Sequence, residues 1–260
     1  MIGDEMKTYI FDLDGTMYRG TSIIEDARLT IEKMHQLNIP YVFLTNNATR
    51  TRTENKENML KMGYQHIEEN MFFTSAMAAV SYAKKRAETN KVAMLGVSGL
   101  KEAIELYGFE LNETESEFLF VGLDVNATYQ DYSKALTILK KGAQLIGTNN
   151  DRMLPNANGF DLGNGAIIAM LEYASGQISV KIGKPYAPIL EEALHYFRLK
   201  KEDVVLVGDN LETDILLGIN HGIESVFVTT GVHQKEDCDR LKIYPDKIVS
   251  SLLELFWTLF

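Results

Sequence analysis

Two aspartates at alternate positions, Asp12 and Asp14, follow a short apolar run and lead directly into Gly15 and Thr16. An apolar run of this length is typical of a buried strand, and Gly15 tolerates the tight backbone that a sharp exit from the strand needs. Two carboxylates at the end of a buried strand repel each other, so a cation, a shared proton or a substrate is needed to stabilise them close together. A turn that merely faces water is the alternative interpretation.

A second pair of carboxylates follows another apolar run. Asp209 comes shortly after the run at 204–207, and Asp214 lies five positions beyond Asp209. With Asp12 and Asp14 these side chains form a set of hard oxygen ligands, which suits Mg²⁺ because this ion takes carboxylates together with water and substrate phosphate oxygens. Asp214 could equally cap a helix start or form an ion pair there. The aspartates therefore predict a magnesium site, provided that the fold brings them together.

Groups that suit a phosphate occur at two other places in the chain. Thr45 and Asn46 follow the apolar run at 41–44 and offer a hydroxyl, an amide and backbone N–H groups at a helix start, which together can cradle a phosphate. Lys184, followed by Pro185 in a loop, offers a point charge for an anion. Taken alone, Thr45 more often caps a strand end or a helix, and a single lysine is usually solvated. The combination predicts a site for a phosphorylated compound.

The elements that must position these residues alternate between strands and helices. Apolar runs of strand length end close to Asp12, Thr45 and Asp209, and a segment with helical spacing of apolar residues lies downstream of each. This alternation predicts parallel β-α-β units in a doubly wound α/β sheet with both faces covered. Ligands bind beyond the carboxyl ends of the strands in such sheets, so these residues are expected to converge on one edge.

The pattern of a buried strand with a polar end returns after residue 178, first at 179–182. This return predicts two domains: a discontinuous core formed by 1–74 and 178–260, and an inserted α/β domain at 75–177. One long sheet in a single domain is the alternative on grounds of length.

Three further segments have weaker local signals. Residues 17–24 are expected to form either a small hairpin or a loop, residues 149–165 are rich in Asn, Gly and Pro and are expected to be loop, and the apolar segment 251–260 is expected to be helical. The five histidines show no ligand spacing, so they are expected at the surface or at helix ends.

Composition narrows the functional classes. Acidic residues outnumber basic ones and give a formal net charge of -10, which disfavours a surface for nucleic acid or an anionic membrane. The single cysteine, Cys238, cannot form an internal disulfide and lies among acidic residues, so it is expected to be an exposed bystander. No apolar signal core occurs near the start and no run is long enough to span a bilayer. A cytoplasmic protein is therefore expected.

Four of these features, taken in order, resemble the four motifs of the haloacid dehalogenase (HAD) superfamily. They are Asp12-x-Asp14-Gly15-Thr16, Thr45, Lys184 and Gly208-Asp209-x-x-x-x-Asp214. The spacing resembles the NagD-like (4-nitrophenylphosphatase) branch, in which a large α/β cap domain lies between the second and third motifs of a Rossmann-like core. The resemblance covers nearly the whole chain, and four motifs in order are far more specific than any one of them.

That resemblance implies phosphoryl transfer through an aspartyl-phosphate. Asp12 would attack phosphorus, and Asp14 would protonate the leaving oxygen and later take a proton from water. Mg²⁺ would be held by the Asp12 carboxylate, the Asp14 main-chain carbonyl and Asp209, with Asp214 just outside this set. The residues implied to bind the phosphoryl oxygens or to neutralise their charge are Thr45, Asn46, Asn47 and Lys184.

The resemblance further implies a small phosphorylated metabolite as substrate: a sugar phosphate, an acid-sugar phosphate or a nucleotide monophosphate. Segments 148–151 and 158–165 are candidates for the surface of the cap that selects it, with an ordinary surface loop as the alternative. Caps of this type often dimerise, so a homo-oligomer formed through the cap is a further expectation.

Three other functions compete with a phosphatase. A dehalogenase would use the same attacking aspartate but needs neither magnesium nor the acid that Asp14 supplies. A phosphotransferase or mutase would replace water with a second acceptor. A non-catalytic phospholigand-binding protein would keep the motifs without turnover, although four intact motifs argue against it.

Overall fold

The computed structural model describes residues 7–156 and 159–258. Within them, contacts between residues divide the chain into two compact units. The first unit draws on 1–45, 52–73 and 193–260, and the second on 46–51 and 74–192. This division places 46–51 and 178–192 with the second unit, whereas the sequence pattern assigned them to the discontinuous core, so the predicted domain boundaries stay a proposal.

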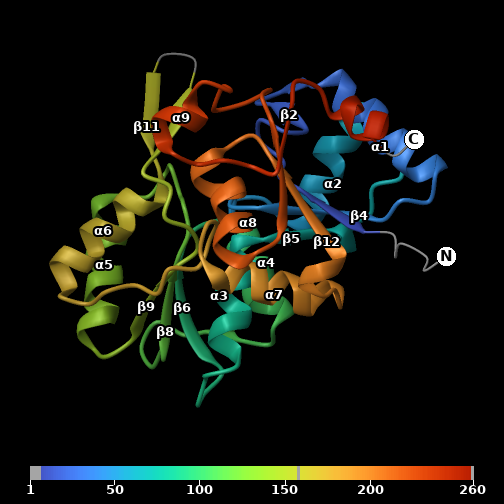
Figure 1. The fold of residues 1–260 in the computed structure, drawn as a ribbon. Helices are drawn as coiled ribbons and strands as arrows, with labels where there is room; N and C mark the ends of the chain where they lie inside the picture. The colour runs from blue at the N-terminus through green and yellow to red at the C-terminus, as the bar shows by residue number, and fades with distance from the viewer. Residues whose placement is uncertain (1–6, 157–158, 259–260) are drawn as a thin grey trace. The chain divides into compact units, whose positions relative to one another are not determined.

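The first unit is built on a six-stranded sheet in the order β14-β13-β12-β1-β4-β5. Its strands are β1 (Thr8–Phe11), β4 (Tyr41–Thr45), β5 (Phe72–Thr74), β12 (Val204–Gly208), β13 (Glu224–Val228) and β14 (Lys247–Val249). β1 runs parallel to both β4 and β12, with Phe11 paired to Phe43 and to Val207. The ends of these three strands therefore lie at one edge of the sheet (Figure 1).

Helices and short turns surround this sheet. They are α1 (Glu25–Gln36), α2 (Arg52–Lys61), α8 (Leu216–His221), α9 (Asp237–Leu241), the π-helix Leu211–Ile215, and the 3-10 helices Glu69–Met71, Lys201–Asp203 and Leu252–Thr258. α7 (Ala187–Phe197) begins in the second unit and ends in the first. α1 shows why such segments are helical: Ala27, Ile31 and Met34 recur at helical spacing and are buried in the core.

The second unit has its own sheet, in the order β7-β6-β8-β9, whose neighbouring strands are parallel. Its strands are β6 (Lys91–Leu95), β7 (Glu110–Leu111), β8 (Phe118–Val121) and β9 (Gln144–Gly147), and its helices are α3 (Ser75–Lys84), α4 (Ser98–Leu106), α5 (Tyr129–Lys140) and α6 (Asn164–Ser175). Apolar side chains of its strands pack with those of α5 and α6 in a separate core. Parallel sheets covered by helices confirm the predicted α/β fold class.

Two of the local expectations about strands were wrong. Residues 149–165 are not simply a loop, because β10 (Met153–Asn156) and β11 (Gly159–Leu162) form an antiparallel hairpin. The many Asn, Gly and Pro residues outweighed the short apolar alternation of Phe160 and Leu162, whose side chains are exposed. Residues 179–182 do not form a strand; one isolated bridge joins Val180 to Ile146.

The other local expectations have mixed outcomes. Residues 17–24 contain the antiparallel hairpin of β2 (Tyr18–Arg19) and β3 (Ser22–Ile23). The apolar segment near the end is helical as expected, but as a 3-10 helix at Leu252–Thr258, and its last two positions lie outside the described residues. No helix in the described part of the chain is long and apolar enough to cross a membrane.

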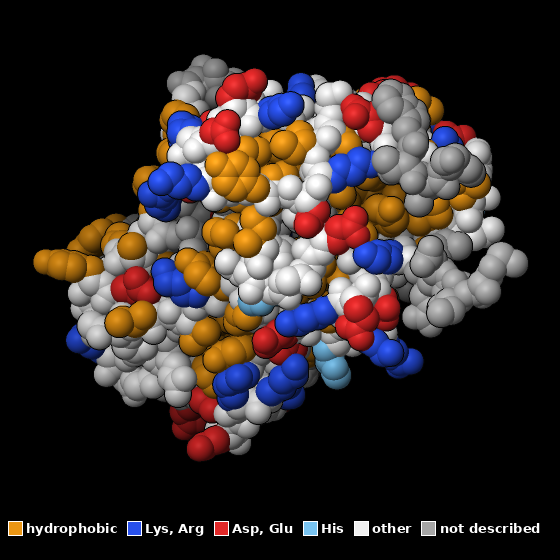
Figure 2. All heavy atoms as spheres, in the orientation of Figure 1, with side chains coloured by type: hydrophobic (Ala, Val, Ile, Leu, Met, Phe, Trp, Pro, Cys, Tyr) orange, Lys and Arg blue, Asp and Glu red, His pale blue; other side chains and the backbone are white. Residues whose placement is uncertain are grey.

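Apolar side chains also reach the surface of the second unit. Met170 and Tyr173 of α6 are exposed, as are Met153, Phe160 and Leu162 of the β10–β11 hairpin. Figure 2 shows apolar side chains at the surface over α6.

Candidate active site

The candidate site of the first unit lies where β1 and β12 end. Asp12 directly follows β1 and Asp209 directly follows β12, and the Asp12 N–H donates to the Val207 carbonyl oxygen at 2.9 Å. This hydrogen bond extends the parallel pairing by one residue beyond the end of β1. The pairing of two buried apolar strands therefore sets the two aspartates side by side, as their positions after apolar runs predicted.

Three carboxylates meet at this edge. One oxygen from each of Asp12, Asp209 and Asp214 lies within 4.8 Å of the other two, with Asp12 half-buried and the others buried. Carboxylates this close repel one another unless a cation or protons offset their charge. Buried, hard oxygen donors form the ligand set that Mg²⁺ prefers, so the residues present fit that ion.

The Asp209 carboxylate is held on both oxygens. Thr16 Oγ1 donates to Oδ1 at 2.8 Å, and the Val232 N–H donates to Oδ2 at 2.7 Å. Two glycines make room for it, because a Cβ on Gly15 would lie 2.3 Å from Oδ2 and a Cβ on Gly231 only 1.9 Å from it. The close approach explains why these positions need glycine, which at Gly15 also adopts a left-handed backbone with φ +96°.

Asp214 is fixed by the turn that separates it from Asp209. The Asn210 N–H donates to Asp214 Oδ2 at 3.1 Å, and the Asp214 N–H donates back to the Asn210 carbonyl oxygen at 2.9 Å. A Cβ on Gly208 would lie 2.3 Å from the Asp214 carboxyl group. The glycine thus lets the carboxylate fold back against the end of β12, where it joins Asp12 and Asp209.

Asp14 lies in the turn that follows β1, and its side chain is exposed. The turn closes through the Gly15 N–H, which donates to the Tyr18 carbonyl oxygen at 2.7 Å, and the Met17 N–H, which donates to the Leu13 carbonyl oxygen at 2.8 Å. Its carboxylate is not part of the three-carboxylate cluster. An exposed carboxylate two residues from a clustered one can exchange protons with water and with a bound molecule.

The loop after β13, residues 229–234, borders the cluster and was not among the predicted site residues. Besides the contact of Val232 with Asp209, Thr230 Oγ1 donates to the Gly15 carbonyl oxygen at 2.8 Å, and Arg19 Nε donates to the Thr230 carbonyl oxygen. Its signal was visible, because Thr229-Thr230-Gly231 directly follows a buried strand, as the predicted site residues do.

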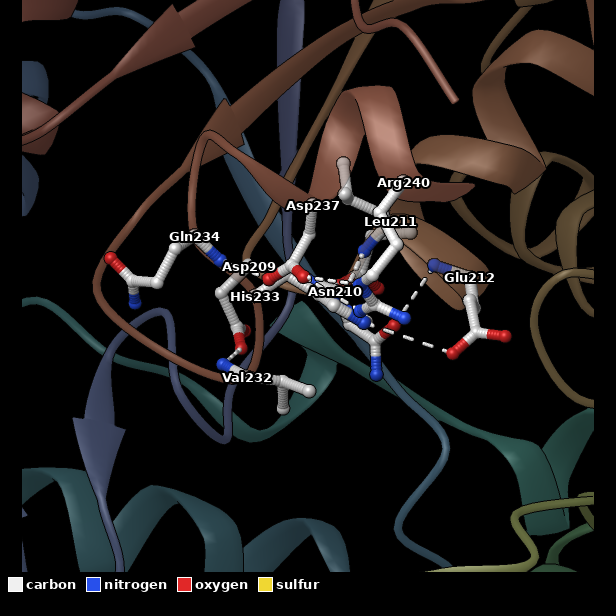
Figure 3. A network of polar contacts seen from close by, with 10 residues as sticks. Asp209, Asn210, Leu211, Glu212, Val232, His233, Gln234, Asp237 and Arg240 are labelled. Carbon is white, nitrogen blue, oxygen red and sulfur yellow. Dashed lines mark hydrogen bonds and ion pairs between the residues drawn. The ribbon is translucent and has the colours of Figure 1, made fainter. Parts of the chain in front are cut away.

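One residue of this loop contradicts the expectation that the histidines lie at the surface or at helix ends. His233 is buried and accepts a hydrogen bond on Nδ1 from the Leu211 N–H at 3.2 Å (Figure 3). Burial lowers the pKa of His233, although the charges of Asp237 and Glu212 act in the opposite direction. A lowered pKa favours the neutral ring, which can accept on Nδ1.

Thr45 is buried at the end of β4. The next residue, Asn46, belongs to the second unit and holds the main chain of Lys184 there. Asn46 Oδ1 accepts from the Lys184 N–H at 2.7 Å, and Asn46 Nδ2 donates to the Lys184 carbonyl oxygen at 3.2 Å and to Asp151 Oδ1 at 3.1 Å. Lys184 itself is only 4% exposed. The alternative interpretation of Lys184 as a solvated lysine is therefore wrong.

Cys238 is also buried, at 4% exposure, rather than the exposed bystander that its charged neighbours suggested. It packs in a small core with Leu211, Ile215 and Phe227, because its side of α9 faces the sheet. Burial raises the pKa of the Cys238 thiol, and the neighbouring charges of Asp239 and Asp237 raise it further. The thiol is therefore a packed apolar group and a poor nucleophile.

Comparison with known proteins agrees with this arrangement. The model of the haloacid dehalogenase-like hydrolases matches residues 9–110, and a second model, of HAD-like hydrolases, matches residues 181–255. An acid sugar phosphatase of Staphylococcus haemolyticus is 38% identical over 232 residues, which cover 89% of this chain and 88% of that protein. The 5'-nucleotidase YutF of Bacillus subtilis is 34% identical over 248 residues, covering 95% of this chain and 96% of that protein.

Solved structures show the same likeness. A p-nitrophenyl phosphatase from Archaeoglobus fulgidus superposes with a TM-score of 0.90 at 30% sequence identity, covering 98% of this chain and 99% of that one. With a parallel sheet, clustered carboxylates at its edge and relatives similar over almost their full length, this chain belongs to the haloacid dehalogenase-like hydrolases, in the NagD-like branch that includes the 4-nitrophenylphosphatases.

Proposed function

We propose that this protein is a Mg²⁺-dependent phosphatase that hydrolyses a small phosphomonoester through an aspartyl-phosphate. The observation that carries the proposal is the meeting of Asp12, Asp209 and Asp214 within 4.8 Å at the carboxyl ends of β1 and β12. It gains support from relatives that are named acid sugar phosphatase, 5'-nucleotidase and p-nitrophenyl phosphatase.

The proposed metal ligands are the carboxylates of Asp12 and Asp209 and the main-chain carbonyl of Asp14, with Asp214 supporting them. Their chemistry suits the ion, because all of these donors are oxygens and the clustered carboxylates need a positive charge among them. When bound, Mg²⁺ would offset the charge that otherwise keeps an anionic nucleophile and an anionic phosphate apart.

In the first step an Asp12 carboxylate oxygen attacks phosphorus and the bond from phosphorus to the leaving oxygen breaks. Asp14 gives its proton to that oxygen, so that the leaving group departs as an alcohol. Attack by a carboxylate divides one difficult displacement into two easier ones. The turn through Gly15 separates the two carboxyl groups, with Asp12 in the cluster and Asp14 exposed.

In the second step Asp14, now a carboxylate, takes a proton from water. The water oxygen forms a bond to phosphorus, and the bond between phosphorus and Asp12 breaks. Inorganic phosphate leaves, and Asp12 and Asp14 return to their starting protonation states. The exposure of Asp14 suits this role, since its carboxylate must meet a leaving group and then water.

The phosphoryl oxygens require donors and positive charge. We assign these roles to the Thr45 hydroxyl, the N–H groups of Asn46 and Asn47, and the Lys184 ammonium, following the family resemblance. The Asn46 side chain takes a different part, because its amide binds the main chain on both sides of Lys184. The Asn46 side chain therefore positions the lysine, and the Asn46 backbone N–H is the group proposed to bind the phosphate.

The substrate classes proposed are acid-sugar phosphates, sugar phosphates and nucleotide monophosphates, as the names of the relatives suggest. We also propose that residues 75–177 act as a cap domain and that the chain forms a homo-oligomer through it. Exposed apolar side chains on α6 and the β10–β11 hairpin are the surface that supports this last proposal.

Hydrolysis of 4-nitrophenyl phosphate tests the reaction class. We expect turnover with Mg²⁺, loss of turnover with EDTA, and recovery when excess Mg²⁺ is added back. Failure to hydrolyse any member of a broad panel of phosphomonoesters in the presence of Mg²⁺ would overturn the proposal. Release of halide from a haloacid without metal would point to a dehalogenase. Comparing kcat/KM across acid-sugar phosphates and nucleoside monophosphates then selects the substrate class.

A further inference from the structure

The loop that carries Asp209 and Asp214 is held by the loop after β13, residues 229–234. The Val232 N–H donates to Asp209 Oδ2 at 2.7 Å, and the His233 N–H donates to the Asp209 carbonyl oxygen at 3.3 Å. Figure 3 shows these residues from the two loops gathered around Asp209. The carboxylate and the main chain of Asp209 are thus both fixed by consecutive residues of one loop.

The side chain of His233 adds a third contact between the loops. Leu211 begins the π-helix that leads to Asp214, and the first N–H groups of a helix have no carbonyl partner within it. The Leu211 N–H donates to His233 Nδ1 at 3.2 Å, and the Glu212 N–H donates to Asn210 Oδ1 at 3.0 Å. The histidine therefore satisfies a buried main-chain donor midway between the two aspartates.

This hydrogen bond defines the state of the ring. Because Nδ1 accepts from an N–H, the ring is neutral and carries its proton on Nε2. Nε2 lies 3.7 Å from Glu212 Oε2. The His233 side chain is 8% exposed, and the segment beyond it is anchored by the Gln234 N–H, which donates to Asp237 Oδ2 at 2.8 Å. Asp237 in turn accepts from Arg240 (Figure 3).

We propose that His233 is a positioning residue for the metal site. It touches no reacting atom, but its Nδ1 fixes the start of the turn from Asp209 to Asp214, so that both carboxylates stay gathered with Asp12 before the ion arrives. Replacing a group that orients metal ligands in this way typically costs about 10- to 100-fold in affinity for the metal or in activity. The inference rests on the proposed Mg²⁺ site.

The test compares the wild-type full-length chain with His233→Phe and His233→Asn. Phenylalanine fills the ring's space without an acceptor, whereas the Oδ1 of asparagine can stand close to where Nδ1 lies. Isothermal titration calorimetry with Mg²⁺ alone should show a Kd about 10-fold higher for His233→Phe. His233→Asn should recover a Kd within about 3-fold of wild type, since outer groups act through the hydrogen bond they make.

Hydrogen exchange without metal gives a readout that does not depend on activity. Peptides that span 208–216 should exchange faster in His233→Phe than in wild type, because the Leu211 N–H has lost its acceptor. His195→Phe is the matched control, since His195 is an exposed histidine of α7, and it should change neither the Kd nor the exchange. If His233→Phe does not fold, His233→Gln takes its place in the test. The side-chain oxygen of glutamine lies near the position of Nε2, so no acceptor stands where Nδ1 accepts from the Leu211 N–H.

Two results would overturn the inference: an unchanged Kd in His233→Phe, or a Kd in His233→Asn as weak as that of His233→Phe. The Asp209→Asn variant lacks a proposed metal ligand and serves as the reference for a chain without the site. If the wild-type chain binds Mg²⁺ no better than this variant, the proposed function is overturned and this inference with it. Normal Mg²⁺ binding by both the wild type and His233→Phe would overturn only the inference about His233.

Discussion

At the scale of single residues, the site is decided by where three carboxylates can approach one another. Asp12 and Asp209 owe their closeness to neighbouring strand ends, and Asp214 to a turn that returns over Gly208. All three are aspartates, so the proposed role of each, as nucleophile, metal ligand or support, follows from its position. Substituting one residue at a time therefore tests these roles separately.

Asp12→Asn should remove turnover while leaving the fold intact. The amide has nearly the same volume but is not a nucleophile, so kcat for 4-nitrophenyl phosphate is expected to fall by about 10³-fold or more. Steady-state kinetics measure the loss, and circular dichroism checks the fold. Retention of most of the activity would remove Asp12 from the role of nucleophile.

Gly231→Ala tests the packing of the loop against Asp209. A Cβ there would lie 1.9 Å from Asp209 Oδ2, so the loop or the carboxylate must move. We expect the affinity for Mg²⁺ to fall by about 10-fold or more, measured by calorimetry. Gly122→Ala is the control, because its Cβ would meet its nearest neighbour at an ordinary 3.4 Å. Equal affinities in the two variants would contradict this account of Gly231.

At the scale of secondary structure, local sequence signals and packing each explain part of the chain. α5 begins with a capping box in which Thr128 and Asp131 bind each other's main-chain N–H groups. The hydrogen bonds from Thr128 lower the pKa of Asp131. The β10–β11 hairpin shows the opposite case, since its apolar residues Met153, Phe160 and Leu162 are exposed and stand among the Asn, Gly and Pro residues that predict a loop.

Thr128→Ala should destabilise the chain by about 1 kcal/mol at neutral pH, the usual cost of losing such a cap. The folded-state pKa of Asp131 lies below its ordinary 3.8, so the stabilisation is present above that value and is lost as the pH falls through the lower, folded pKa. Thermal unfolding of both proteins at neutral and acidic pH measures the difference, which should shrink in acid. The alanine variant keeps the N–H bond of position 128 to the Asp131 carboxylate and loses the hydroxyl bond to it. A difference independent of pH would therefore contradict a contribution of that hydroxyl bond to stability.

At the scale of the whole molecule, metal binding should be coupled to stability. An ion that binds the folded chain and not the unfolded one stabilises it by about 2.7 kcal/mol at 100 times its Kd. Adding Mg²⁺ is therefore expected to raise the Tm of the wild type, and adding EDTA to lower it. In Asp209→Asn the Tm should respond little to either. A wild-type Tm that ignores Mg²⁺ would argue against the cluster as a metal site.

The sequence by itself determined the fold class, the succession of the main strands and helices along the chain, and which aspartates follow the strand ends at the sheet edge. It could do so because buried parallel strands are continuous apolar runs, and because their carboxyl ends share one edge. Asp12 and Asp209 were predictable in this way, since each directly follows such a run.

Only the tertiary structure decided what surrounds those aspartates. His233 and Cys238 have no local pattern that reveals their burial, because contacts between residues distant along the chain bury them. The same holds for Lys184, whose main chain is held by Asn46 from a segment far earlier in the sequence. Periodicity reports which face of an element is apolar, whereas the partner that covers that face is chosen by packing.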